Sequence, residues 1–267
     1  MGHAVLHAPD DVRAAEIYRS IIWNLREAGI PYLVGGTYAL EHHAGLVRAT
    51  KDLDLFVRRA DWSRIAETLA PLGVRCALVF SHWLGKAFED DYFVDLIFAG
   101  GNGLVEVDDD WLTHGVPSVV LDVPVHLAPA EEMIWSKSFV MERERFDGAD
   151  VTHILRKSGP SIDWVRLLRR YGPHAPILLA HLLMFRFAYP GHRGHIPDWV
   201  MEELWRRSRA EERLPENLCR GTLISREQYL IDITEWGYLD AREMPLGRMT
   251  PQQIDEWTQA IVEDTQE

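Results

Sequence analysis

The sequence predicts an α+β fold: a mixed sheet flanked by helices, followed by an all-helical C-terminal region. Two observations lead to this prediction. In the first part of the chain, amphipathic segments alternate with short apolar runs that have the length and period of strands. From about Ser161 onward only helical periodicity remains, interrupted by turn residues such as Gly172-Pro173 and Pro190-Gly191. We therefore expect two domains, over residues 1–158 and 159–267.

The individual elements follow from residue spacing and from glycine or proline stops. Residues 11–29 carry apolar side chains three or four positions apart, which is typical of an amphipathic helix, and Gly29 ends it. Residues 51–57 alternate between aliphatic and other side chains, which is the period of a strand. Strands are expected at 30–34, 51–57, 74–80, 92–98 and 119–127. Helices are expected at 11–29, 37–43, 62–72, 129–141, 164–170, 177–187, 199–207 and 254–262.

The composition indicates a globular protein of a reducing compartment. The formal net charge of −13 disfavours broad, non-specific nucleic-acid binding, which needs a basic face. Cys76 and Cys219 lie far apart without a CxxC motif, which argues against a disulfide framework or a zinc ribbon. The N-terminus lacks a signal-peptide pattern, and no apolar run reaches the roughly 18 residues of a membrane span. We expect a cytoplasmic protein with no membrane partner.

Three aspartates are the main candidates for chemistry. Asp52 and Asp54 are two residues apart on a predicted strand, so their side chains point to the same side. Their charges repel each other, and a divalent cation such as Mg²⁺, which prefers carboxylate oxygens, removes the conflict. The alternative is a strand edge with two solvated aspartates. Asp95 lies in a second apolar strand, where a lone carboxylate is costly unless it is paired or at a strand end bonded to loop amides.

If the strands of Asp52 and Asp95 are neighbours, three carboxylates converge. Such a group can hold two metal ions about 3.5–4 Å apart, the arrangement used for in-line phosphoryl displacement. The Gly35-Gly36-Thr37 turn precedes a predicted helix, whose N-terminus offers free N–H groups to a phosphate. Without the aspartates, the turn would be read as an ordinary strand–helix connection. Asp108-Asp109-Asp110 is expected to be a solvated loop.

Together these motifs resemble the DNA polymerase β-type nucleotidyltransferase superfamily. The resemblance covers roughly residues 30–155 and is carried by Gly35-Gly36-Thr37-Tyr38-Ala39-Leu40, by Arg48-Ala49-Thr50-Lys51-Asp52-Leu53-Asp54-Leu55, and by Asp95 on a later strand. Among members, the sequence is most similar to the bacterial abortive-infection and toxin-like nucleotidyltransferases. They also carry a downstream lysine helix and an Arg/Asp segment, matched here by Lys137 and residues 142–151.

The resemblance implies a role for each matched residue. Asp52, Asp54 and Asp95 would be the metal-binding catalytic carboxylates, holding two Mg²⁺ ions (Mn²⁺ is an alternative), and Asp95 would help to deprotonate the acceptor. Gly35, Gly36 and Thr37 would hold the phosphates of an NTP such as ATP. Lys137 would offset triphosphate charge, or it is a surface lysine; Arg48 would contact phosphate or pair with an acid. Asp147 and Asp150 share a predicted helix face, where they either anchor basic residues or are solvated.

The implied reaction moves an NMP from an NTP to an acceptor hydroxyl and releases pyrophosphate. The acceptor is a small molecule, a tRNA or a protein; the acidic balance favours a non-nucleic acceptor, and the toxin-like resemblance keeps tRNA open. Two other functions stay open: a catalytically inactive nucleotide- or partner-binding module of the same fold, and a metal-dependent phosphohydrolase. Arginines of the helical part are the expected anion contacts: Arg166, Arg169, Arg170, Arg186 and Arg193.

Overall fold

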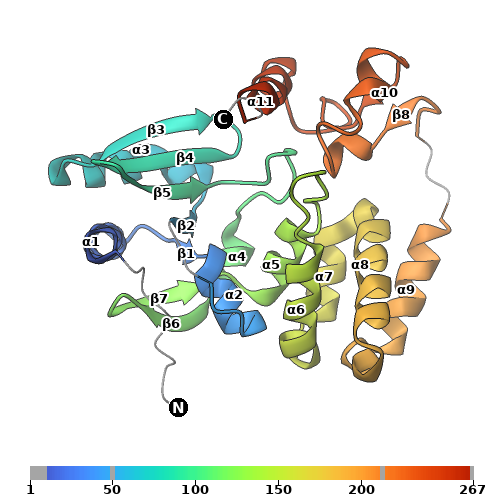
Figure 1. Cartoon of the computed structure of the whole chain (residues 1–267), viewed down its shortest axis with the longest axis horizontal. Coiled ribbons are helices and arrows are strands. Elements are labelled where there is room, and N and C mark those ends of the chain that lie inside the picture. The colour runs from blue at the N-terminus through green and yellow to red at the C-terminus, as the bar shows by residue number, and fades with distance from the viewer. Residues whose placement is uncertain (1–10, 49–51, 211–213, 265–267) are drawn as a thin grey trace. The chain divides into compact units, whose positions relative to one another are not determined.

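The structure of the protein is a computed structural model, which describes residues 11–48, 52–210 and 214–264. The chain divides into two compact units, Met1–Pro129 and Ala130–Glu267, and each is described by itself (Figure 1). The domain boundary predicted at 158–159 lies within the second unit. How much of the chain makes up a catalytic domain therefore stays a prediction.

A seven-stranded mixed sheet forms the centre of the first unit. Its spatial order is β3-β4-β5-β2-β1-β7-β6. β2 pairs in parallel with β5, and β1 with β7, while the other neighbours are antiparallel. The strands are β1 (Leu33–Val34), β2 (Leu53–Phe56), β3 (Arg75–Phe80), β4 (Leu84–Glu89), β5 (Tyr92–Ile97), β6 (Val116–Val120) and β7 (Val123–Leu127). The mixed sheet with flanking helices confirms the predicted α+β class.

Helix α1 (Val12–Glu27) forms because its apolar residues recur on one face and Asp11 caps its first turn. That face, including Ile17, Tyr18 and Ile21, is buried in one core with the aliphatic residues of β2 and β5. The other helices of this unit are α2 (Gly36–Ala44), α3 (Trp62–Leu69) and α4 (Asp109–Thr113), with 3₁₀ turns at Arg59–Asp61 and Ala70–Leu72. α1 and α3 thus bury one side of each of the strands that carry the candidate aspartates.

The sequence analysis missed one strand of the first unit, and two of its predictions for this unit were wrong. Strand β4 was not predicted, because Gly85 and Lys86 interrupt its alternation; Gly85 is needed there since a side chain would collide with the Trp62 ring. The single strand predicted at 119–127 is a hairpin, in which Leu121 and Asp122 turn the chain with positive φ angles of 50° and 64°. Asp108 is not in a solvated loop: its side chain accepts hydrogen bonds from two backbone N–H groups and caps α4.

The second unit is mainly helical. Its helices are α5 (Ala130–Lys137), α6 (Gly148–Ser158), α7 (Trp164–Tyr171), α8 (Ala175–Ala188), α9 (Asp198–Ser208), α10 (Leu230–Thr234) and α11 (Pro251–Asp264), with 3₁₀ turns at Gly159–Ser161, Gly172–His174, Pro190–His195 and Gly221–Leu223. The expectation of an all-helical region was wrong, because β8 (Leu218–Cys219) and β9 (Leu239–Asp240) pair in parallel. Two-residue strands are too short to show a period in the sequence.

Buried ion pairs join elements of the second unit. Arg166 on α7 donates to Glu131 (2.6 Å) and to Glu132 (2.5 Å) on α5, and Arg170 donates to Glu132 (3.1 Å). Arg166 and Glu132 are fully or almost fully buried. Arg166 is therefore a structural residue, and its predicted availability for an anionic ligand was wrong. Among the described helices, none is long and apolar enough to cross a membrane.

Candidate active site

The register of the sheet places two of the predicted carboxylates side by side. β2 and β5 run parallel with Asp54 directly opposite Asp95. Residues opposite each other in neighbouring parallel strands point to the same face of the sheet. The residues on either side of them, Leu53 and Leu55 on β2 and Val94 and Leu96 on β5, are buried in the core beneath α1. Asp54 and Asp95 therefore project from the opposite face.

The glycine turn lies directly against Asp54. The Gly35 N–H donates a hydrogen bond to the backbone carbonyl of Asp54 (2.9 Å). Gly36 has a φ of +50°, and a Cβ atom there would collide with Asp54 Oδ2; a Cβ at Gly35 would collide with the ring of Phe56. Only glycine satisfies both the backbone angle and the close approach at Gly36.

Helix α2 begins at this turn, and its N-cap residue, Gly35, has no side chain that could cap it. The first N–H groups of a helix have no partner within the helix, and they carry the positive end of its dipole. Thr37 lies in this first turn and is partly exposed. The turn thus presents hydrogen-bond donors and partial positive charge next to the Asp54 carboxylate, as binding of an anionic phosphate requires.

Asp52 directly precedes β2 and is partly exposed. Burial raises the pKa of Asp95, the nearby Lys86 lowers this pKa in part, and the negative charge of Asp52 raises it further. The charge of Asp52 thus disfavours ionisation of Asp95.

A lysine that the sequence analysis did not select completes this group. Lys86 lies on β4 opposite Asp95, and its Nζ is 3.1 Å from Asp95 Oδ1 and 3.5 Å from the ring centroid of Phe93. The signal that would have found it is strand β4: an antiparallel neighbour of β5 places position 86 beside position 95.

Carboxylate oxygens, which Asp52, Asp54 and Asp95 offer, are the ligands that hard divalent cations such as Mg²⁺ prefer. Asp95 Oδ1 is buried and, among the described residues, accepts no well-aligned hydrogen bond despite its ion pair with Lys86. In the described part of the chain, no three His, Cys, Asp or Glu side chains are close enough together to form a metal site. Mg²⁺ often uses only one or two carboxylates and completes its shell with water and substrate phosphate. A cation held by these aspartates would therefore have to use that mode rather than an all-protein cage.

The predicted residues Lys137, Asp147 and Asp150 form a cluster in the second unit. Lys137 Nζ is 2.9 Å from Asp147 Oδ2 and 2.9 Å from Asp150 Oδ2, and Arg145 also donates to Asp147. Asp147 and Asp150 therefore anchor a basic residue, and the alternative of a solvated face was wrong. Burial opposes ionisation of Asp147, but Lys137 and Arg145 outweigh it, so the pKa of Asp147 is lowered. A nucleotide-binding role of Lys137 stays a prediction.

The segment between α2 and β2 contains the rest of the predicted motif. Arg48 is exposed at the end of a described stretch. Thr50 and Lys51 lie outside the described residues, as does the start of the predicted strand 51–57. A phosphate contact by Arg48 stays a prediction.

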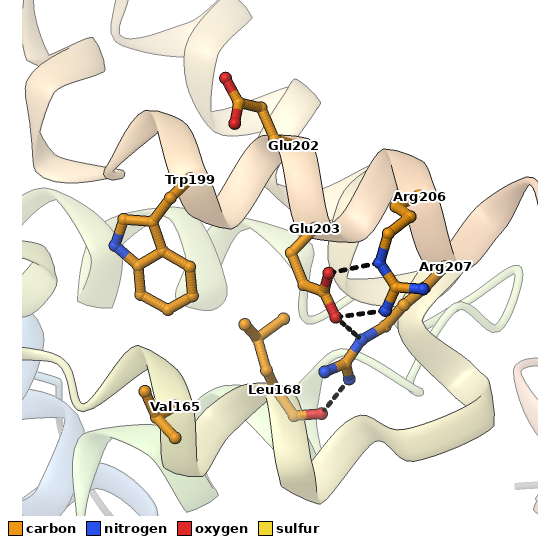
Figure 2. Close-up of a pocket in the computed structure, with 7 residues that line it drawn as sticks. All are labelled: Val165, Leu168, Trp199, Glu202, Glu203, Arg206 and Arg207. Carbon is orange, nitrogen blue, oxygen red and sulfur yellow. Dashed lines mark hydrogen bonds and ion pairs between the residues drawn. The ribbon is translucent and has the colours of Figure 1, made fainter.

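A hollow of about 430 Å³ lies between α7 and α9, within the second unit (Figure 2). It is lined by Val165, Leu168, Trp199, Glu202, Glu203, Arg206 and Arg207. Glu203 accepts from Arg206 and from Arg207, each at 2.7 Å, and Arg207 also donates to the Leu168 carbonyl (2.8 Å). The two arginines are thus already engaged with Glu203.

No known family profile and no curated protein matches the sequence. Several solved structures that resemble the chain are nucleotidyltransferases or nucleotidyltransferase-like proteins. The antibiotic-resistance factor ANT(2'')-Ia aligns over 69% of this chain and 97% of its own, with 18% identity and a TM-score of 0.39. The lincosamide antibiotic adenylyltransferase LnuA aligns over 55% of this chain and 98% of its own, with 12% identity and a TM-score of 0.39. An antigenic nucleotidyltransferase-like protein from Paracoccidioides brasiliensis aligns over 73% of this chain and 100% of its own, with 16% identity and a TM-score of 0.43. The function is therefore inferred from the site residues.

Proposed function

We propose that this chain is a metal-dependent nucleotidyltransferase that moves an NMP from an NTP to an acceptor hydroxyl. The observation that carries the proposal is the position of Asp54, which lies in register beside Asp95 and directly against the Gly35-Gly36 turn. A phosphate-binding turn and paired carboxylates thus meet at one point. The acceptor is a small molecule, a tRNA or a protein, and the reaction takes place in the cytoplasm, where NTP and Mg²⁺ are available.

The glycine turn and the first turn of α2 bind the triphosphate through backbone N–H groups. Asp52 and Asp54, with Asp95 beside them, are the residues that would hold Mg²⁺ or Mn²⁺. When bound, such a cation would offset the charge of the phosphates and of the leaving pyrophosphate. Lys137 is proposed to add positive charge to the triphosphate.

The acceptor hydroxyl attacks the α-phosphorus, a new P–O bond forms, and the bond to the β-phosphate oxygen breaks as pyrophosphate leaves. Asp95 takes the hydroxyl proton. Its burial favours this role, because a carboxylate whose pKa is raised is a stronger base. The protein otherwise contributes position and electrostatic stabilisation rather than covalent chemistry.

The test uses each NTP in two forms, one labelled on the α-phosphate and one on the γ-phosphate. Transfer of either label to an acceptor is measured in the presence of Mg²⁺. The acceptor panel contains tRNA, protein and aminoglycosides. We expect α-label to reach one acceptor class with the wild type and transfer to be lost in Asp54→Asn. Asp90→Asn is the matched control, because this exposed carboxylate lies at the β4–β5 turn; it should leave transfer unchanged.

Two results would contradict the proposal. Tight NTP binding without transfer to any acceptor, including the chain itself, indicates the inactive binding module. Release of free γ-phosphate alone indicates a phosphohydrolase.

A further inference from the structure

Lys86 is held against Asp95 by the sheet itself. The antiparallel pairing of β4 with β5 sets the two residues opposite each other, and Lys86 Nζ reaches Asp95 Oδ1 at 3.1 Å. The ammonium also packs on the face of Phe93, with Nζ 3.5 Å from the ring centroid. The Lys86 side chain is only 22% exposed. This ammonium is therefore a fixed positive charge in the site and not a mobile surface group.

A fixed ammonium has two effects on a divalent cation approaching Asp95. It is already paired with one oxygen of the Asp95 carboxylate, Oδ1, and its charge repels the cation at short range. Asp54 lies on the other side of Asp95, away from β4, and abuts the glycine turn. Lys86 thus lies against Asp95, and the Gly35-Gly36 turn lies against Asp54.

We infer that Lys86 takes the place of one of the two cations expected from the sequence, so that the site holds a single divalent cation, through Asp52 and Asp54. Lys86 then remains on Asp95 and positions it beside the acceptor hydroxyl. This inference rests on the proposed function and sets its metal requirement at one ion, not at the two ions that the sequence resemblance implies.

A purely structural Lys86 would offset the charge of Asp95 and so stabilise the fold, but it would not affect how many cations the site binds. The two roles differ in what removal of the charge does. Loss of a structural contact loosens the site and weakens cation binding. Loss of a built-in counter-cation frees Asp95, and cation binding increases.

The test is a titration of the full chain with Mn²⁺ alone, in which electron paramagnetic resonance measures the free ion. We expect one Mn²⁺ per wild-type chain and two per chain in Lys86→Met at the same free concentration. Lys86→Arg keeps the charge and should bind one. The control is Lys157→Met, which removes the same charge from an exposed position in the second unit and should also bind one.

Two Mn²⁺ ions in the wild type, or the same number and affinity in Lys86→Met as in the wild type, would overturn the inference. If label transfer is observed in either case, the proposed function stands without it. No Mn²⁺ bound at all would overturn both the inference and the proposed metal dependence. If Lys86→Met does not fold, the wild-type number and that of Lys86→Arg still decide between one ion and two.

Discussion

Gly36 shows how a single backbone position determines the geometry of the candidate site. Its φ of +50° is unfavourable for any residue with a Cβ, and that Cβ would also collide with the Asp54 carboxylate. We predict that Gly36→Ala lowers the free energy of unfolding by about 1–3 kcal/mol. Because the collision displaces a proposed metal ligand, we also expect transfer to fall by about 100-fold. Chemical denaturation and the labelled-NTP assay measure the two effects.

Gly73 offers a control for the Gly36 prediction, because a substitution there strains the backbone without displacing Asp54. It has a φ of +83°, and a Cβ atom added there would meet no described atom within 4 Å beyond its chain neighbours. Gly73→Ala should therefore cost about 1 kcal/mol of stability and leave transfer intact. If Gly36→Ala behaved in the same way, Asp54 would not be held by the turn.

Asp147 supplies a prediction about pH. Lys137 and Arg145 lower its pKa in the folded chain below the ordinary value of 3.8, despite the opposing effect of burial. A carboxyl with a lowered pKa stabilises the folded state above its unfolded pKa, and this contribution is lost as the pH falls through the folded value. The wild type should therefore be more stable than Asp147→Asn at pH 7, and the difference should shrink below about pH 4. A constant difference across that range would exclude this ion pair as its source.

At the scale of elements, the buried pairing of α5 with α7 depends on Arg166. Removing this residue leaves Glu131 and Glu132 as buried carboxylates with reduced compensation. We predict that Arg166→Met destabilises the chain by about 3–5 kcal/mol. Arg169→Met, at an exposed position of the same helix, should change stability by less than about 0.5 kcal/mol. Equal effects in urea denaturation would show that the buried pair contributes little.

The sequence was sufficient to predict elements with a long, regular period. α1 and β5 were found because their apolar residues recur over several turns or alternations. The β6–β7 hairpin was read as one strand because its turn consists of Leu121 and Asp122 rather than the glycine or asparagine usual at positive φ. Residue spacing alone therefore does not distinguish one strand from a hairpin here, and the distinction depends on tertiary contacts.

The sequence was sufficient to select the carboxylates of the candidate site but not its lysine. Asp54 and Asp95 were selected as carboxylates in otherwise apolar strands, and their pairing needed only that β2 and β5 be neighbours. Lys86 was not selected because its strand contains a glycine required by the Trp62 ring, a tertiary contact invisible in local sequence. A lysine becomes informative only when its strand partner is known.

At the scale of the whole molecule, the net charge of −13 complicates any metal experiment, because cations also stabilise an acidic chain by screening. A specific site has a distinct signature. Mg²⁺ at about 100 times its Kd should raise the free energy of unfolding by about 2.7 kcal/mol, and EDTA should remove the gain. Asp54→Asn should lose the gain as well. Thermal unfolding in NaCl of the same ionic strength measures the effect of screening alone. If Mg²⁺ shifted the Tm of the wild type and of Asp54→Asn equally, screening would explain the shift.

The two edges of the sheet differ. β6 contains Pro117, which lacks an N–H donor, whereas β3 has neither proline nor charge from Cys76 to Phe80 and exposes Leu78 and Val79 by 38% and 43%. An apolar edge strand can add a strand from another chain, so concentrated solutions should aggregate through β3. Val79→Lys should raise the concentration at which light scattering increases, and lysine placed at the β6 edge should not. For anyone preparing this protein, solubility is then limited by one strand and can be improved there without changing the carboxylates.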